Sequence, residues 1–241
     1  MGIYYNSKTP GVFDDNLAIY LDATLEESYP GSGGTWFDLS GRDNHGTFVN
    51  SPTQSRSAFP YQIDLQGSQK DYVDLAASTY QYTTQNTCLV AFRPTNVLNY
   101  YGQVLQKANR FDFYMRFAST TGEWQTAYTI SNPGGGTSSV GGTRSGVLTN
   151  NQWYIAQMTI DCETNLVARF YLNGVKYQEN SIAAGSTLRN NSSELRSGLI
   201  SQGGGIEHYT GGVGMIRMFD RFLDESEIQF EYNSFKGRFG I

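Results

Sequence analysis

With 241 residues, the chain is long enough to bury a sizeable core as one β-sandwich domain, without the disulfide framework that small secreted domains need. Its formal net charge is −5 and its basic residues form no stripe, so the sequence argues against a nucleic-acid partner. It contains no apolar run of about 18 residues, so we expect no membrane span.

The composition favours an all-β fold. The chain holds 17 Tyr, 14 Phe and 27 Gly, whereas only 16% of its residues are charged. Strands favour aromatic residues, and the turns between them favour Gly. Cys88 and Cys162 are the only cysteines. Because both lie in or beside strand patterns, we expect buried free thiols, and a disulfide between them is the alternative.

Residues 1–14 are predicted to form an arm in front of a single domain over residues 15–241. The apolar residues of this arm are Tyr4, Tyr5, Val12 and Phe13. They follow no strand or helix period, so the arm can pack on its own domain, fray, or dock on a neighbouring subunit. For the last case these four are the candidate partner-binding residues. The segment has no apolar core of signal-peptide length, so no secretion signal is expected.

Alternating and continuous apolar runs predict a series of strands. In chain order these are residues 17–21, 47–49, 72–75, 86–92, 102–107, 111–118, 124–130, 153–160, 167–172, 175–177 and 212–219. Asn173-Gly174 is the most informative turn, because Asn-Gly supplies the positive φ angles of a tight hairpin. We therefore expect an antiparallel meander there. Pro94 is expected to end the strand over 86–92, since proline cannot donate to a ladder.

Residues 131–146 read SNPGGGTSSVGGTRSG, the longest low-complexity stretch of the chain. Gly, Ser and Thr bury little apolar surface, so we expect a mobile loop here. A loop of this length is either functional or disordered.

A single short helix is expected near the C-terminus. Asp224 can cap it, and Glu227, three residues later, can complete a capping box. The expected apolar face consists of Ile228, Tyr232 and Phe235. Gly237 is expected to end the helix. No internal domain boundary is predicted.

Four segments together are similar to those of one family. They are LAIYLDA at 17–23 with the loop that follows at 29–48, GSQKDYV at 67–73, the Trp-Tyr to Asn-Gly hairpin at 153–174, and the closing strand and helix at 216–240. On these segments the chain resembles the concanavalin A-like, laminin-G-type jelly-roll domains. The resemblance implies a two-sheet antiparallel jelly-roll sandwich with one short C-terminal helix.

The two ends of the chain resemble a narrower group. The opening YYNSKTPG (4–11) and the ending YNSFKGRFG (232–240) are similar to variants of this domain in structural proteins of tailed bacteriophages, especially those of marine bacteria. This implies a non-catalytic protein on the virion surface, made in the host cytoplasm, that acts as a capsid decoration or an appendage component. Its partners would be other virion proteins of a capsid or tail lattice, and homo-oligomers are expected from the prevalence of symmetric assemblies.

Sugar binding is another property of this family, and it needs an exposed aromatic face. Trp36, Trp124 and Trp153 are candidates by residue type. Trp153 holds a core-like position in its strand pattern. Trp36 lies in a loop and is the candidate carbohydrate-binding residue, and the alternative is that it folds onto the sandwich. A carbohydrate-binding module that adheres to host surface glycans is therefore the second functional hypothesis.

Some relatives are polysaccharide hydrolases that use Glu-x-Asp-x-x-Glu on one strand, because period two places these carboxylates on one face. No Glu of this chain has Asp two residues later. A carboxyl pair from two distant strands stays open as an alternative. His45 and His208 lie in Gly-rich loops without a Gly-x-Ser-x-Gly motif, so we expect them to be solvated. We therefore predict no catalytic residues and no enzyme activity.

A calcium site is the one cofactor that the sequence leaves open. Oxygen-bearing residues gather in the segment DLSGRDNHG, namely Asp38, Ser40, Asp43 and Asn44. Ca²⁺ prefers oxygen ligands on loops, but Asx turns that hold the loop explain the same pattern. Related domains often supply an acid just before the closing strand, where this chain has Gly214-Met215. We therefore assign no metal ligands, with a structural calcium as the alternative.

Overall fold

The computed structural model describes residues 16–56, 59–75, 80, 82, 84–97, 102–107, 112–118, 122–189, 194–199 and 208–241. The predicted arm over residues 1–14, with Tyr4, Tyr5, Val12 and Phe13, lies outside the described residues. The division into an arm and a domain therefore stays a prediction.

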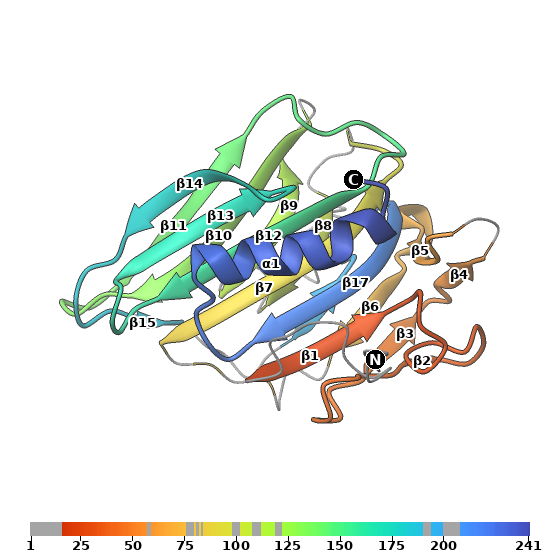
Figure 1. Ribbon diagram of the computed structural model, residues 1–241, viewed down its shortest axis with the longest axis horizontal. Helices are drawn as coiled ribbons and strands as arrows, with labels where there is room; N and C mark the ends of the chain where they lie inside the picture. Colours follow the sequence, from red (N-terminus) through yellow and green to blue (C-terminus); the bar gives the residue numbers. More distant parts are fainter. Residues whose placement is uncertain are drawn as a thin grey trace, which may run out of the picture.

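Two antiparallel sheets stack into a sandwich (Figure 1). The first contains β1 (Leu17–Asp22), β4 (Thr53–Ser55), β5 (Gln62–Leu65), β7 (Gln85–Pro94), β12 (Tyr154–Asp161), β13 (Val167–Leu172), β14 (Val175–Ser181) and β17 (Gly211–Phe219). Its strand order is β14-β13-β12-β7-β17-β5-β4, and β1 also pairs with β17.

The second sheet contains β2 (Thr35–Trp36), β3 (Gly46–Val49), β6 (Tyr72–Leu75), β8 (Gln103–Lys107), β9 (Phe113–Ala118), β10 (Glu123–Ser131), β11 (Thr137–Arg144), β15 (Thr187–Leu188) and β16 (Leu195–Ser197). Its order is β11-β10-β9-β8-β16-β6-β3-β2, with β15 on β10. One α-helix, α1 (Glu225–Phe235), lies in the described part of the chain, together with the 3-10 turns η1 (Gly67–Gln69) and η4 (Lys236–Arg238). The predicted all-β jelly-roll sandwich with one short C-terminal helix is confirmed.

The first sheet is buried on both of its faces. Along β12, Tyr154, Ala156 and Met158 belong to the main core between the sheets. Ile155, which points the other way, belongs to a second apolar cluster that also includes Phe235 of α1. Figure 1 shows α1 lying across this outer face. The central strand β7 runs between β12 and β17, and its middle, residues 88–92, is apolar and buried on both faces.

The hairpin between β13 and β14 has the predicted turn. Asn173 and Gly174 have φ angles of 50° and 72°. Gly174 is needed for a second reason, because a Cβ there would lie 2.5 Å from the ring of Tyr232 on α1. The tip of the hairpin thus packs against the helix.

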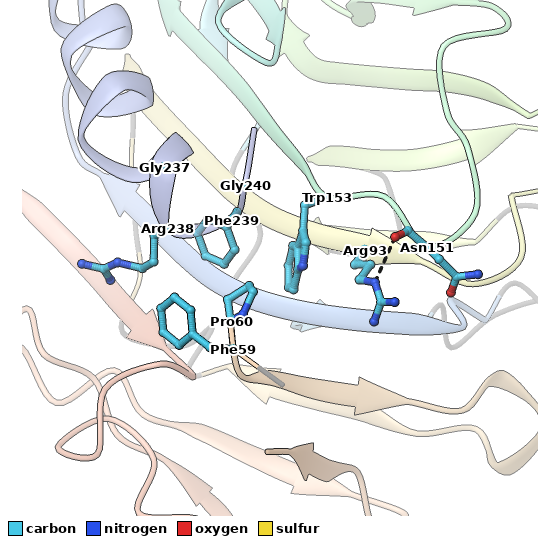
Figure 2. A pocket seen from close by; sticks show the side chains of 9 residues that line it. All are labelled: Phe59, Pro60, Arg93, Asn151, Trp153, Gly237, Arg238, Phe239 and Gly240. Carbon is cyan, nitrogen blue, oxygen red and sulfur yellow. Dashed lines mark hydrogen bonds between the residues drawn. The ribbon is translucent and has the colours of Figure 1, made fainter. Parts of the chain in front are cut away.

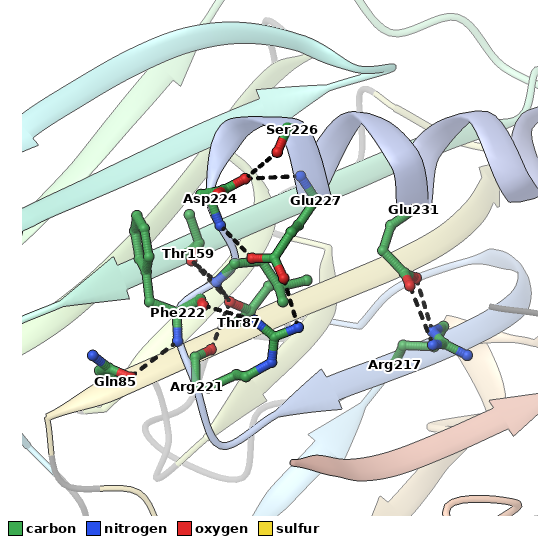
Figure 3. Close-up of polar contacts among 11 residues, drawn as sticks. Gln85, Thr87, Thr159, Arg217, Arg221, Phe222, Asp224, Ser226, Glu227 and Glu231 are labelled. Atoms are coloured by element: carbon green, nitrogen blue, oxygen red, sulfur yellow. Dashed lines mark hydrogen bonds and ion pairs between the residues drawn. The ribbon is translucent and has the colours of Figure 1, made fainter. Parts of the chain in front are cut away.

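The capping box at the start of α1 is present (Figure 3). The Asp224 carboxylate accepts a hydrogen bond from the Glu227 backbone N–H, and the Glu227 carboxylate accepts one from the Asp224 N–H, each 2.9 Å long. The helix ends at Phe235, and Gly237 lies inside the following 3-10 turn. With Lys236 as the C-cap, Gly237 takes the position directly after it, where the expected terminating glycine belongs, although without a positive φ.

The prediction of a mobile loop over residues 131–146 was wrong. Only the tip around Gly135 and Gly136 is a turn, and residues 137–144 form β11, paired with β10 along its whole length. The glycines serve close packing, since a Cβ on Gly142 would lie 2.6 Å from the Cβ of Gln178 on β14. The two sheets approach each other along this edge, and side chains larger than hydrogen would hold them apart.

Both cysteines are buried free thiols, as predicted. Burial raises the pKa of both thiols, to about 11 for Cys162. No helix in the described part of the chain has the length and apolar character that a membrane span requires.

Candidate functional site

A cleft of about 500 Å³ opens where β7 ends and β12 begins. Nine residues line it: Phe59, Pro60, Arg93, Asn151, Trp153, Gly237, Arg238, Phe239 and Gly240 (Figure 2). They come from the loop between β4 and β5, the end of β7, the segment before β12, and the chain after α1. We call it the aromatic cleft.

The aromatic rings at the centre of the cleft rest on the backbone of β17. The ring centroids of Trp153 and Phe239 are 4.8 Å apart, with an angle of 43° between the planes. A Cβ on Gly214 would lie 2.5 Å from Phe239 Cε1 and 2.9 Å from Trp153 Cη2. Glycine at this position on the outer face of the strand therefore lets both rings lie against the sheet.

Hydrogen bonds hold the polar end of the cleft. The Nε of Arg93 donates to the carbonyl oxygen of Asn151 at 3.1 Å, and the Asn151 N–H donates to the carbonyl oxygen of Pro94 at 2.6 Å. Asn151 adopts a φ of 64°, in the left-handed region that asparagine tolerates better than most residues. This turn fixes Arg93 beside Trp153, as Figure 2 shows.

At the other end of the cleft, the Arg238 guanidinium already binds groups within the fold. Its Nη1 donates to the buried carboxylate of Asp22, and its charge lies 5.2 Å from the ring centroid of Phe235. Phe59 forms the open wall, with 62% of its surface exposed. Its ring packs only edge-on against Tyr61, at 5.9 Å.

A second hollow of about 470 Å³ adjoins the aromatic cleft. Four residues line both: Asn151, Trp153, Phe239 and Gly240. The second hollow continues past them to Asn173 and Ile241. A chain of several sugar units or another extended ligand could therefore continue past the Trp153 ring from one hollow into the other.

The lining of the aromatic cleft limits its chemistry. None of its nine residues is an Asp, Glu, His, Cys, Ser, Thr, Tyr or Lys. The guanidinium of arginine stays protonated, so the lining holds no nucleophile and no general acid or base. What it offers is aromatic surface flanked by N–H donors, the composition typical of small-molecule binding sites.

The outer face of the second sheet carries two neighbouring carboxylates, and a pair of carboxylates is what glycan hydrolysis would need. There Arg196 lies between two carboxylates, 3.7 Å from Asp74 and 3.1 Å from Glu194, and its guanidinium stacks 4.8 Å from the centroid of Tyr72. Burial raises the pKa of Asp74, Arg196 lowers it, and Glu194 raises it. The pKa of Asp74 is raised overall, and the single positive charge of Arg196 bridges the two carboxylates without fully neutralising them, so the group is an ion-pair network.

The candidate carbohydrate-binding residue Trp36 has no exposed face. Its exposed fraction is 0%, as is that of Trp124, and both rings belong to the main core. Trp36 pairs with Gly46 in the short ladder between β2 and β3, which turns its ring inward. The structure therefore contradicts a sugar-stacking role for Trp36. Trp153, predicted to be structural, is the tryptophan that lines a cleft.

The two histidines are not simply solvated. His208 is buried, with 5% exposed, and burial together with the charge of Lys70 lowers the pKa of its imidazole. His45 accepts a hydrogen bond from the Asp38 N–H at 3.0 Å, so it helps to hold its loop.

In the loop where the sequence left a calcium site open, hydrogen-bond donors of the protein surround the Asp38 carboxylate. Asp38 accepts hydrogen bonds from the backbone N–H groups of Tyr20, Ser40 and Asn44 and from the Ser40 hydroxyl. This is the Asx-turn arrangement that the sequence offered as the alternative. Across the described ranges, no group of three or more His, Cys, Asp or Glu is placed to hold a metal ion. Calcium binding stays the untested alternative that the sequence left open.

Sequence reasoning missed most of the cleft. Arg93, Asn151 and Phe239 are separated by up to 146 residues along the chain, so no local pattern joins them. The available signal was Gly214, a glycine inside a strand whose sequence, GGVGMIRMF, is mostly apolar. Glycine inside a strand marks the close approach of another group.

The comparisons with known proteins agree with this fold. Residues 66–229 match the family model described as the concanavalin A-like lectin/glucanases superfamily. The chain belongs to this superfamily. None of the curated proteins matches the chain.

Several solved structures share the fold of this concanavalin A-like domain. The binding domain of botulinum neurotoxin DC in complex with SialylT has a TM-score of 0.65 at 14% identity, covering 92% of this chain and 52% of that chain. The same neurotoxin domain in complex with rat synaptotagmin II has a TM-score of 0.63 at 12% identity, with the same coverage.

The binding domain of Paraclostridial Mosquitocidal Protein 1 has a TM-score of 0.62 at 15% identity, covering 92% of this chain and 53% of that chain. At these identities the likeness shows the fold alone. The concanavalin A-like domain spans about half the length of these structures.

Proposed function

We propose that this protein is a non-catalytic, lectin-like binding module and that its aromatic cleft binds a glycan. The observation that carries the proposal is the partly exposed ring of Trp153, which packs on the buried Phe239 ring and the Gly214 backbone and lines the cleft together with the exposed ring of Phe59. Flat aromatic surfaces suit the C–H faces of a sugar ring, and Arg93 and Asn151 can donate to its hydroxyl groups.

Two further points support binding over catalysis. The cleft lining holds no group that could act as nucleophile, acid or base, and the carboxylates around Arg196 are ion-paired. The neighbours in fold are binding domains, one of them solved with SialylT and one with rat synaptotagmin II. Both points, the lining of the cleft and the kind of neighbours, are consistent with a module that adheres to glycans.

We further propose that this binding takes place on a virion surface, where the protein serves as a capsid decoration or an appendage component. Support comes from the resemblance of residues 4–11 and 232–240 to structural proteins of tailed bacteriophages. The arm over residues 1–14 would attach the module to other virion proteins or to further copies of itself, and the cleft would reach a host surface glycan.

The test of the cleft is a glycan array followed by calorimetric titration of the best ligand. Phe59→Ala is the decisive variant, since this ring is mostly exposed and its loss should leave the fold intact. We expect it to weaken binding by about 1 kcal/mol, the scale of one aromatic contact. Phe37→Ala, which removes a ring that is 40% exposed in another loop, is the matched control and should bind as the unchanged protein does. An array without reproducible binding, or equal loss in both variants, would reject the proposal.

A further inference from the structure

We infer that the aromatic cleft selects acidic saccharides, those that carry a carboxylate or a sulfate group. This inference rests on the proposed glycan-binding function, and it names the class of ligand. Arg93 is the residue that would recognise the anion.

The charge of the cleft differs in sign from that of the molecule. The whole chain carries a net charge of −5, whereas the nine lining residues include two arginines and no acid. An anion in the cleft would therefore meet positive charge and no acid among the lining residues. A neutral sugar would gain nothing from that contrast.

The two arginines are not equivalent. Arg238 already donates to the buried carboxylate of Asp22, so much of its charge is used within the fold. Arg93 makes a single hydrogen bond, from Nε to the Asn151 carbonyl, and no ion pair with any described residue. Its two terminal nitrogens point away from that bond. A guanidinium end with two open N–H donors matches the two oxygens of a carboxylate or a sulfate.

An acidic residue near Arg93, Asp64, would oppose the binding of an anion. Asp64 on β5 lies beyond Gly212, which pairs with Arg93 on one side and with Asp64 on the other. Arg93 lowers the pKa of Asp64, but burial raises it more, and the Asp64 carboxylate takes its hydrogen bond from Gln62. Asp64 therefore influences Arg93 through its charge at a distance. The two terminal nitrogens of Arg93 stay available to a ligand.

Aromatic and cationic groups are arranged to act on one ligand. Phe59 and Trp153 line the same cleft as Arg93, and Asn151 holds the guanidinium beside the Trp153 ring (Figure 2). A sugar ring placed against the aromatic surface would bring a ring substituent to the guanidinium. The second hollow allows further units of the same chain to continue past Trp153.

The test compares glycans that differ only in charge. One pair is an oligogalacturonate and its methyl ester, which removes the carboxylate charge. The other is neoagarohexaose before and after chemical sulfation. Binding of each is measured by calorimetry at low and at physiological salt, with the unchanged protein, with Arg93→Gln, and with Arg144→Gln on β11 as the charge-matched control.

We expect the charged member of at least one pair to bind more tightly than its neutral partner, and the pair that does so identifies carboxylate or sulfate as the group. Arg93→Gln should reduce that binding roughly 10- to 100-fold, the usual effect of losing a charge-assisted pair, whereas Arg144→Gln should not. Added salt should weaken the interaction. Thermal melting of the variants confirms that each is folded.

The failures are distinguishable. If neutral and charged members bind equally and Phe59→Ala weakens both, the cleft binds glycans without charge selection, and only this inference is overturned. If the charged members bind but Arg93→Gln has no effect, the assignment of Arg93 is wrong. If no member of either pair binds, the inference and the proposed function both lose their support.

Discussion

Asp161 fixes the turn between β12 and β13 with a single carboxylate. It accepts hydrogen bonds from the backbone N–H groups of Glu163, Thr164 and Asn165 at 2.8 to 3.0 Å, and from the Asn165 side chain at 2.7 Å. Burial alone would raise the pKa of the carboxyl, but these donors outweigh it and lower the pKa to about 2. The charged form is therefore the one that stabilises the turn.

Asp161→Asn should lower the free energy of unfolding at pH 7 by about 2 kcal/mol. The pKa of this carboxyl is lower in the folded chain than in the unfolded chain. Its contribution is therefore complete above about pH 4 and disappears as the pH falls through about 2. Urea unfolding at pH 7 and at pH 2.5 measures this. A variant whose deficit is the same at both values would show that the charge does not matter.

Single residues also show why the candidate site was misassigned. Trp36 reads as a loop residue because glycines surround it, yet two residues of strand pairing turn its ring into the core. Trp153 reads as a core residue because its strand alternates, yet it lies just before the first residue of β12, where the sheet ends. Trp153 was read in the correct strand pattern, whereas the two-residue strand that holds Trp36 was read as loop, and in both cases exposure depends on where the strand begins or ends.

The helix α1 is joined to β17 by a buried ion pair. Arg217 and Glu231 are both fully buried, with 3.0 Å between Nε and Oε2, as Figure 3 shows. The Arg217 guanidinium also lies 4.5 Å from the ring centroid of Tyr20. The pair fixes the position of the helix on the outer face of the first sheet, and the segment after the helix carries Arg238 and Phe239 into the cleft.

Replacing one partner of this pair should be costly, because it leaves the other charge buried alone. We expect Glu231→Leu to lower the free energy of unfolding by roughly 3–5 kcal/mol, and the double variant with Arg217→Met to recover most of that loss. Urea denaturation of the two single variants and the double variant forms the cycle. Nearly additive losses would mean that the two side chains do not depend on each other.

The longer strands of apolar period and the helix were predictable, whereas β11 and the short strands β2, β4, β5, β15 and β16 were not predicted. Strands with apolar period two, the Asn-Gly turn and the Asp224 capping box follow from local chemistry, and each is present. The strand β11 was missed because its sequence, TSSVGGTR, lacks apolar residues. It is held by its ladder with β10 and by the approach of β14, contacts that no window of the sequence contains.

At the level of the whole chain, the outer faces of the two sheets differ. The helix covers the outer face of the first sheet, whereas Tyr72, Asp74 and Arg196 lie on the outer face of the second. The aromatic cleft lies at an end of the covered sheet. It could not be predicted, because its walls come from four segments that only the completed fold brings together.

Deleting residues 1–13 tests the proposed role of the arm. We expect the truncated protein to melt at nearly the same temperature, since the expected arm follows no strand or helix period and precedes β1 (Leu17–Asp22). Its attachment to virus particles should weaken, as judged by the copies retained after purification. Full occupancy without the arm would contradict the docking model.

If a ligand enters the cleft beside Trp153, the emission of this tryptophan will report its binding. Trp36 and Trp124 are fully buried, so a ligand in the cleft can change the surroundings of Trp153 alone. Titration with a glycan that binds by calorimetry should shift the emission and protect it from acrylamide quenching, and Trp153→Phe should abolish both changes. If a glycan binds fully while the emission of the unchanged protein stays constant, its site lies elsewhere, and the proposal that the aromatic cleft binds the glycan is contradicted.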